Sequence, residues 1–246
     1  MKGSIERMIK TNREIKTLKK SASIANSCIP VIENALKENE ITEKEIARRI
    51  RRKIYSQGAT LAFRILVASG KRSAIVHPKP SATDKKIDGT GYVDFGASYK
   101  NYKSDITVPF VVGKIGKREM KMVNAVVAAH NLAMRSIKIG MPCWKLHEKV
   151  NTFLRMKGFR MIHAMGHGLG KNVHELPYIG KPRKKLRGLK KRRWERLKKI
   201  VFQENMVFTV EPAVYLKNVG GCRLENVVLI TKREPGILTH ARLIKA

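Results

Sequence analysis

Four carboxylates are the residues of this chain whose type and spacing are best suited to chemistry. Asp94 and Asp105 flank one glycine-containing turn, and Glu211 and Glu225 flank another. Three of the four lie in apolar, strand-like segments (Tyr-Val-Asp-Phe, Phe-Thr-Val-Glu and Arg-Leu-Glu-Asn-Val-Val). Burying an ionised carboxylate costs several kcal/mol unless it is paired or binds a metal. Each acid alone is equally typical of a buried salt bridge, but the four together favour a metal site.

Three histidines follow one another in the segment His-Ala-Met-Gly-His-Gly-Leu-Gly-Lys-Asn-Val-His, which begins at His163 and contains His167 and His174. A lone histidine is usually a core residue, but three among three glycines favour a functional cluster, because glycine permits close backbone approach. One imidazole with four carboxylates suits Mn²⁺, Co²⁺ or Fe²⁺, with Zn²⁺ as an alternative. Four anionic ligands exceed the need of one divalent ion, so we expect two metal ions.

The elements that position these residues follow a pattern of helices, strands, helices and strands. Apolar residues at helical spacing predict helices within residues 5–57, where Thr42-Glu-Lys-Glu45 reads as a capping box. Short β-branched runs punctuated by Gly and Pro predict strands between residues 61 and 112. Helices are then expected near 117–137 and 143–157, and strands near 163–169, 206–214 and 223–230. The order predicts an α+β fold of two αβ halves with a similar plan.

The chain is strongly basic, with 52 Lys and Arg residues against 19 Asp and Glu residues and a net charge of +33. Such a charge suits a polyanion such as ribosomal RNA, and equally a well-solvated basic surface. Residues 181–199 contain twelve Lys or Arg residues and one acid, with apolar residues spaced for a short amphipathic helix. We expect this basic insertion to bind RNA or the ribosome, with an ordinary solvated surface as the alternative.

Cysteine content and hydropathy bear on the compartment. Cys28, Cys143 and Cys222 are odd in number and form no Cys-x-x-Cys pair, which favours a reducing compartment. The chain contains no run of about 18 apolar residues, so the sequence predicts neither a signal peptide nor a membrane span. We therefore expect a cytoplasmic protein without a membrane contact.

The quoted segments resemble the pita-bread metallopeptidases, a family that includes methionine aminopeptidase, aminopeptidase P, prolidase and the creatinase relatives. The resemblance rests on Val-Asp-Phe-Gly-Ala, Ser-Asp-Ile-Thr, Gly-His-Gly-Leu-Gly-Lys-Asn-Val-His-Glu, Val-Glu-Pro-Ala and Gly-Gly-Cys-Arg-Leu-Glu-Asn, and it covers nearly the whole chain. It implies the pita-bread fold, with two pseudo-symmetric αβ halves around a dinuclear metal site. It also implies one catalytic domain over residues 1–246, without the separate N-terminal domain of the Xaa-Pro peptidases.

The resemblance further assigns roles to individual residues. The implied ligands of two metal ions, with Asp105 and Glu225 bridging, are Asp94, Asp105, His167, Glu211 and Glu225. Glu211 is also implied to move the proton of the attacking water. His77, in Ile-Val-His-Pro, matches the histidine near the substrate amine or leaving group, while His163 and His174 match those that contact the scissile peptide. Arg223 is typical of the proline-specific branch and is implied to help bind the substrate.

The resemblance therefore implies an aminopeptidase or dipeptidase that hydrolyses the N-terminal peptide bond, with Xaa-Pro as the expected substrate and a two-metal-activated hydroxide as nucleophile. Ala213, Asn226 and the pair Lys171-Asn172 depart from the family pattern and put substrate choice in doubt. One alternative is a methionine aminopeptidase acting on nascent chains. The other is a non-catalytic RNA- or ribosome-binding protein on a peptidase scaffold, which the charge favours and the complete ligand set opposes.

Overall fold

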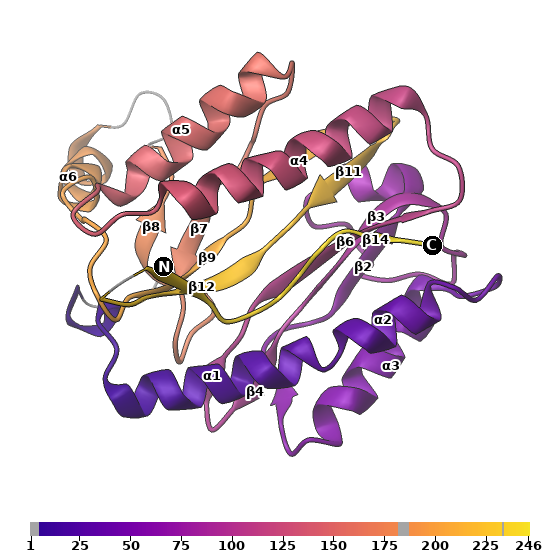
Figure 1. Ribbon diagram of the computed structural model, residues 1–246, viewed down its shortest axis with the longest axis horizontal. Helices are drawn as coiled ribbons and strands as arrows, with labels where there is room; N and C mark the ends of the chain where they lie inside the picture. Colours follow the sequence, from indigo (N-terminus) through magenta and orange to yellow (C-terminus); the bar gives the residue numbers. More distant parts are fainter. Residues whose placement is uncertain (1–4, 182–186, 233) are drawn as a thin grey trace.

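The computed structural model describes residues 5–181, 187–232 and 234–246, and two groups of helices flank its two main β-sheets (Figure 1). The first half contains η1 (Ile5–Met8), α1 (Asn12–Asn26), α2 (Ile29–Ala35), α3 (Glu43–Tyr55), β1 (Thr60–Leu61), β2 (Leu66–Ser69), η2 (Gly70–Ala74), β3 (Gly89–Phe95), β4 (Ala97–Tyr99), β5 (Tyr102–Lys103) and β6 (Ile106–Val112). The second half contains α4 (Lys117–Ser136), α5 (Cys143–Met156), β7 (Gly166–Gly168), β8 (Glu175–Ile179), α6 (Gly188–Leu197), β9 (Val207–Val210), β10 (Ala213–Leu216), β11 (Gly220–Arg223), β12 (Asn226–Ile230), β13 (Pro235–Ile237) and β14 (Ile244–Lys245).

The helices begin where the sequence offers caps. At the start of α1, Thr11 Oγ1 accepts from Glu14 N (3.3 Å) and the Glu14 carboxylate accepts from Thr11 N (2.9 Å), which completes a capping box. At α3 only half of the predicted box forms. Thr42 Oγ1 accepts from Glu45 N (3.2 Å), but the Glu45 carboxylate pairs with Arg48 and Arg49 instead of returning to the cap. Among the described residues, no helix has both the length and the apolar character needed to cross a bilayer.

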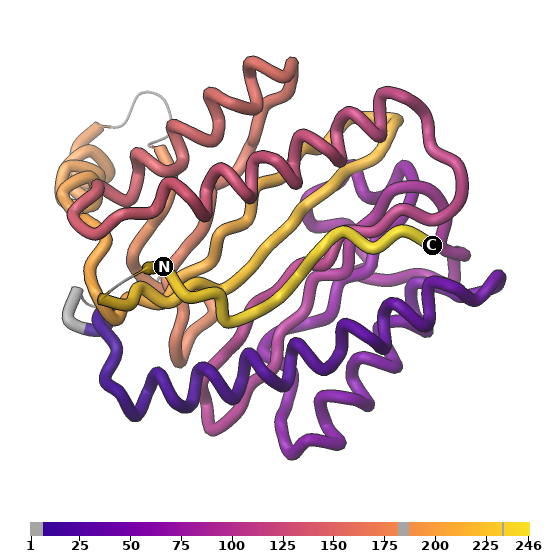
Figure 2. The backbone as a smooth tube through the Cα atoms, viewed as in Figure 1, coloured from indigo at the N-terminus to yellow at the C-terminus, as the bar shows by residue number. Residues whose placement is uncertain are grey.

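The two main sheets run in the orders β14-β6-β3-β2 and β13-β12-β9-β7-β8. All their strand pairs are antiparallel except β14 with β6, where the end of the chain returns to the first sheet (Figure 2). An isolated bridge between Thr107 of β6 and Glu225, just before β12, joins the two sheets. Buried side chains of both sheets, including Phe95, Phe110 and Phe208, belong to one continuous apolar core. The two halves therefore meet at the strands that bear the acidic residues.

The predicted order of two αβ halves is confirmed, and the structure corrects several strand boundaries. The strand region expected from residue 61 onward begins with two short strands, β1 and β2, and the strand expected near 163–169 shortens to Gly166–Gly168. The run near 206–214 is divided at Glu211-Pro212, because proline has no N–H to donate to a ladder. The run near 223–230 is divided at Leu224-Glu225. Glu211 and Glu225 thus lie where a strand is interrupted, so their side chains do not have to follow the alternating directions of a regular strand.

The basic insertion at 181–199 contains the expected short helix, α6, although residues 182–186 lie outside the described part of the chain. The apolar side chains of this helix are poorly buried. Leu189 is 81% exposed, and Trp194 and Leu197 are only half-buried. Figure 1 shows α6 at the edge of the molecule beside the start of α5. The helix is therefore a largely solvated basic element.

Candidate metal centre

All nine residues singled out in the sequence line one pocket of about 490 Å³. They come from both halves of the chain and from nine separate strands or loops. The nine are His77, Asp94, Asp105, His163, His167, His174, Glu211, Arg223 and Glu225. The structure thus places every candidate together, and what each residue does there stays a prediction.

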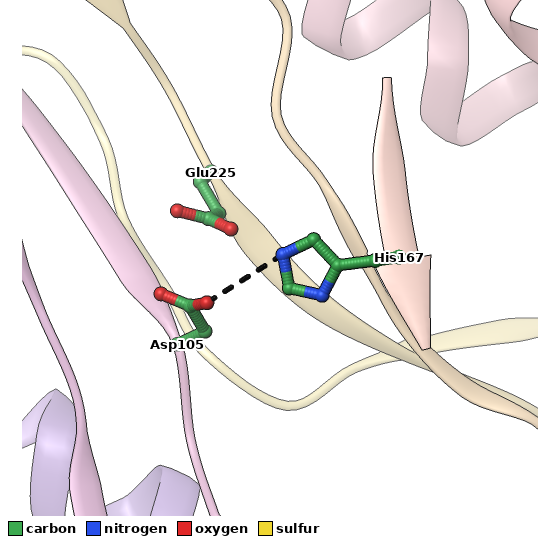
Figure 3. A group of neighbouring side chains, drawn as sticks. All are labelled: Asp105, His167 and Glu225. Atoms are coloured by element: carbon green, nitrogen blue, oxygen red, sulfur yellow. Dashed lines mark ion pairs between the residues drawn. The ribbon is translucent and has the colours of Figure 1, made fainter. Parts of the chain in front are cut away.

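Asp105, His167 and Glu225 form the centre of this pocket, and each offers a ligand atom within 4.8 Å of the other two. Figure 3 shows the three side chains converging from three different chain segments. Asp105 directly precedes β6, His167 lies in β7, and Glu225 separates β11 from β12. His167 Nε2 lies 3.8 Å from Asp105 Oδ2. All three side chains are buried, so this is a desolvated cluster of two acids and one imidazole.

The other two acids, Glu211 and Asp94, line the same pocket. Glu211 Oε1 lies 3.5 Å from His167 Nε2, so the imidazole faces carboxylates from both halves. Asp94, in β3, is opposite Thr107 of β6 and accepts a hydrogen bond from Arg223. The predicted set of five ligands therefore consists of a tight group of three, with Glu211 beside it and Asp94 linked to a cation.

Close backbone packing fixes the position of His167. A Cβ atom on Gly166 would lie 1.9 Å from Thr209 O, and one on Gly168 would lie 1.8 Å from Leu176 O. Only glycine fits at these two places, as the glycine-rich sequence predicts. His167 N also donates to Thr209 Oγ1 (3.1 Å). With a proton on Nδ1 directed to Gly168 O (3.2 Å), the lone pair of Nε2 faces the carboxylates, as metal-binding histidines require.

Arg223 is a buried cation whose nitrogens all have partners. Nε donates to Thr107 Oγ1 (3.1 Å), one terminal nitrogen donates to Tyr215 Oη (2.7 Å), and the other donates to Asp94. Its guanidinium also lies 4.5 Å from the ring centre of Tyr92. Burial opposes the charge, but Tyr215 and Asp94 raise the pKa of Arg223, so it is a permanent cation. It therefore offsets one of the four carboxylates.

The remaining negative charge is not balanced by the protein. Burial raises the pKa of Asp105 and of Glu211, and the neighbouring Glu225 charge raises both further. Burial and the charge of Asp94 raise the pKa of Glu225 to about 7. Three carboxylates thus resist ionisation because Arg223 is the one buried cation among the residues that line the pocket. A site with this surplus of acceptors favours binding of cations.

The histidines of the pocket are neutral at pH 7. Burial lowers the pKa of His163 to about 4 and that of His167 to about 3, and it also lowers the pKa values of His77 and His174. The ring of His174 lies 4.2 Å from that of His167. A neutral imidazole can bind a metal or donate one hydrogen bond, and both actions suit the predicted roles.

The donor set fits two divalent cations. Four carboxylates against one arginine leave three surplus negative charges once all the acids ionise, and an oxygen-rich set with one imidazole is the chemistry that hard or borderline divalent ions prefer. Two ions would bring four positive charges and would hold the acids in their ionised form. The residues present therefore fit the dinuclear site that the resemblance implies.

Several residues of the site were not found from the sequence. Thr107 Oγ1 donates to Glu225 Oε2 (2.7 Å), and Tyr215 Oη lies 3.3 Å from His163 Nε2. Phe63 and Arg64 line the pocket from the turn between β1 and β2. Hydroxyl and aromatic residues in strands are typical of any sheet, so the sequence gave no reason to select Thr107, Phe63 or Arg64. Tyr215 could have been selected, because it directly follows the Val-Glu-Pro-Ala-Val segment that contains Glu211.

Comparison with known proteins supports the fold and the class. Over 238 residues the chain is 32% identical to the Xaa-Pro dipeptidase of Pyrococcus furiosus, covering 95% of this chain and 63% of that protein. The prolidase structure from Thermococcus sibiricus superimposes with a TM-score of 0.84 at 31% identity, covering 97% of this chain and 62% of that one. The structure of an X-Pro aminopeptidase from Thermotoga maritima superimposes with a TM-score of 0.83 at 31% identity, covering 98% of this chain and 65% of that one.

Two αβ halves that enclose a carboxylate-rich pocket define the pita-bread class of metallopeptidases, and the predicted fold is confirmed. The chain belongs to metallopeptidase family M24, whose model matches residues 16–232. The chain spans a little under two thirds of the length of the relatives it matches.

Proposed function

We propose that this chain is a metal-dependent peptidase that hydrolyses the N-terminal peptide bond of Xaa-Pro substrates, as a dipeptidase or aminopeptidase. The observation that supports this most directly is the convergence of four carboxylates and His167 on one pocket that also contains three further histidines. The similarity to Xaa-Pro dipeptidases and prolidases supports proline as the second residue. Methionine aminopeptidase activity is the alternative that the substrate assay below would reveal.

In this proposal Asp94, Asp105, His167, Glu211 and Glu225 hold two divalent cations, with Mn²⁺ or Co²⁺ preferred and Fe²⁺ or Zn²⁺ as alternatives. When bound, such ions lower the pKa of a coordinated water and polarise the substrate carbonyl.

The chain's own groups supply the proton transfers and the substrate contacts. The carboxylate of Glu211, whose pKa burial raises, accepts the proton of the attacking water and passes it to the leaving amine. His174 donates to the carbonyl oxygen of the scissile bond, and His77 contacts the amine or leaving group. The ring nitrogens of His163 face Ala164 O and Tyr215 Oη, so His163 must release one of these bonds to contact the substrate.

The decisive assay is a panel of Xaa-Pro and Met-Xaa peptides, each tested with Mn²⁺, Co²⁺, Fe²⁺ and Zn²⁺. We expect the fastest cleavage with proline in the second position. Faster cleavage of Met-Ala peptides would identify a methionine aminopeptidase instead. Absence of cleavage with every metal, in protein shown to bind two ions, would support the non-catalytic alternative.

A second proposed property is contact with RNA through α6. Lys190, Lys191, Arg192 and Arg193 are exposed, and within the described part of the chain none of them forms an ion pair. Unpaired cations on one helix attract phosphate groups regardless of base sequence. Such contact would bring a peptidase close to emerging N-termini on a ribosome.

A cytoplasmic location is also part of the proposal. Cys28, Cys143 and Cys222 are all free and buried. Burial raises the pKa of each thiol to about 12, so none forms a reactive thiolate. Three unpaired cysteines are typical of proteins in a reducing compartment.

A further inference from the structure

Lys10 and Glu175 form an ion pair that is almost completely buried, although the two residues are 165 positions apart in the chain. The side chains are each 2% exposed, and Lys10 Nζ lies 2.9 Å from Glu175 Oε2. Lys10 Nζ also donates to Arg7 O (2.7 Å), and Lys10 N donates to Asn205 O (2.9 Å). Burying two charges is expensive, so such a pair persists only where its geometry is well satisfied.

The other oxygen of Glu175 closes the loop before it. Glu175 Oε1 accepts from Asn172 N (3.0 Å) and from Asn172 Nδ2 (3.2 Å), and Arg7 lies 3.4 Å away. Within this closed turn, His174 directly precedes Glu175. One carboxylate therefore ties the turn that bears His174 to the segment that precedes α1.

The same pair packs against the backbone of the glycine-rich segment. A Cβ atom on Gly170 would lie 2.6 Å from Glu175 Oε2 and 2.9 Å from Lys10 Nζ, so the ion pair occupies the space beside this glycine. Gly170 N donates to Asn172 O (3.1 Å), and Gly170 O accepts from Lys103 N (2.8 Å). The loop over residues 170–175 is thus held from the N-terminal segment and from β5.

We infer that Lys10 and Glu175 are positioning residues that hold the ring of His174 at the pocket by clamping loop 170–175 to the N-terminal segment. Neither residue lines the pocket, whereas His174 lines it and lies 4.2 Å from the His167 ring. The clamp joins Lys10, just before α1, to Glu175, the first residue of β8, so the N-terminal segment takes part in organising the site. The activity arm of its test rests on the proposed function, and the exchange arm does not.

The test compares Lys10→Met, Glu175→Gln, the double variant and the charge-preserving Lys10→Arg with the wild type. Hydrogen exchange of the Asn172 amide reports the loop directly, because this amide donates to Glu175. We expect exchange at least about tenfold faster in the two single variants, since local opening no longer breaks a buried ion pair. The double variant removes the uncompensated charge and regains stability while its loop still exchanges fast, and Lys10→Arg restores slow exchange.

Peptide turnover is measured on the same proteins, below their unfolding temperatures. Misplacing a group that acts on the reacting carbonyl lowers kcat by about tenfold or more and leaves KM within about twofold. The control is Ile50→Ala, which creates a cavity in the buried face of α3 and lowers stability without touching loop 170–175. It should show wild-type kcat and slow Asn172 exchange.

Wild-type exchange at Asn172 and wild-type kcat in folded Lys10→Met and Glu175→Gln would overturn the inference. So would equal effects in Ile50→Ala, because these would show general destabilisation. If the wild type cleaves no peptide, the proposed function fails, and the exchange measurements alone then decide whether the clamp exists.

Discussion

The buried guanidinium of Arg223 donates a hydrogen bond to the carboxylate of Asp94, so one candidate metal ligand is already paired with a cation of the protein. Arg223 also donates to Thr107, Tyr215 and Val76 O, and Thr107 in turn donates to Glu225. One side chain thus connects two of the carboxylates, one directly and one through a hydroxyl. In an ordinary buried salt bridge the cation contacts only its acidic partner, whereas Arg223 also donates to two hydroxyl groups that hold it in place.

Replacing Arg223 with lysine should destabilise the fold although the charge is kept. A lysine has one nitrogen and cannot reach Asp94, Thr107 and Tyr215 together, which leaves buried acceptors unsatisfied. We expect the free energy of unfolding in urea to fall by about 2 kcal/mol. The matched control is Arg242→Lys, because Arg242 forms a largely exposed ion pair with Glu33. This control substitution should change the free energy of unfolding little. An equal loss in both variants would contradict the role of the network.

Metal content should depend on Glu225. We expect two divalent ions per wild-type chain by elemental analysis after loading with Mn²⁺ or Co²⁺. In Glu225→Gln we expect fewer than two, because the substitution would remove a negative charge that offsets the repulsion between cations held close together. Glu148→Gln, at the exposed pair with Lys181, is the control and should retain both ions. Full occupancy in Glu225→Gln would refute the assignment of Glu225.

The free energy of unfolding should depend on pH through His130. Burial lowers the pKa of His130 to about 4 from an ordinary value of 6.5, and its Nε2 faces the Asn226 amide at 3.2 Å. Between these two values the unfolded chain binds more protons than the folded one, so stability is complete above pH 6.5 and is lost as pH falls toward 4. The contribution of this group over that range is about 3 kcal/mol.

Urea unfolding of metal-free protein at several pH values between 4 and 7 measures this dependence. The slope of the unfolding free energy against pH should be smaller in His130→Leu than in the wild type. His240→Leu, which removes an exposed histidine, should keep the wild-type slope. An unchanged slope in His130→Leu would show that other buried histidines account for the acid sensitivity.

Charge reversal on α6 should weaken binding to RNA if this helix is a docking site. The variant changes Lys190, Lys191, Arg192 and Arg193 to Glu. Its affinity for ribosomal RNA should fall, and the fall should be larger at low salt than at high salt, while turnover of short peptides stays the same.

The matched control reverses four exposed cations of α1, which changes the net charge by the same amount. These are Arg13, Lys16, Lys19 and Lys20. A local site on α6 predicts that the α1 variant binds RNA more tightly than the α6 variant. Equal losses would show that RNA responds only to the total charge, and the α6 proposal would then fail.

The sequence alone predicted the architecture and nine residues that line the pocket. Helical spacing, β-branched runs and the order of segments predicted two αβ halves, because periodicity reports which face of each element is buried. Acids in apolar strands and glycines around His167 marked the site, because both features are costly without a function or a close contact. Two predicted strands were wrong in their extent, since each is interrupted, at Glu211-Pro212 and at Leu224-Glu225, by backbone geometry that periodicity does not report.

Only the tertiary structure decided which residues support those of the site. The contacts of Arg223 with Tyr215 and Thr107, and that of Lys10 with Glu175, join residues up to 165 positions apart, and no local pattern distinguishes such a lysine from the many others in this basic chain. Hydrogen bonds and ion pairs form or fail with differences of a few tenths of an ångström in the distances between side chains. Those distances are set by the packing of the two halves against each other, whereas the residue types that bind metal can be read along the chain.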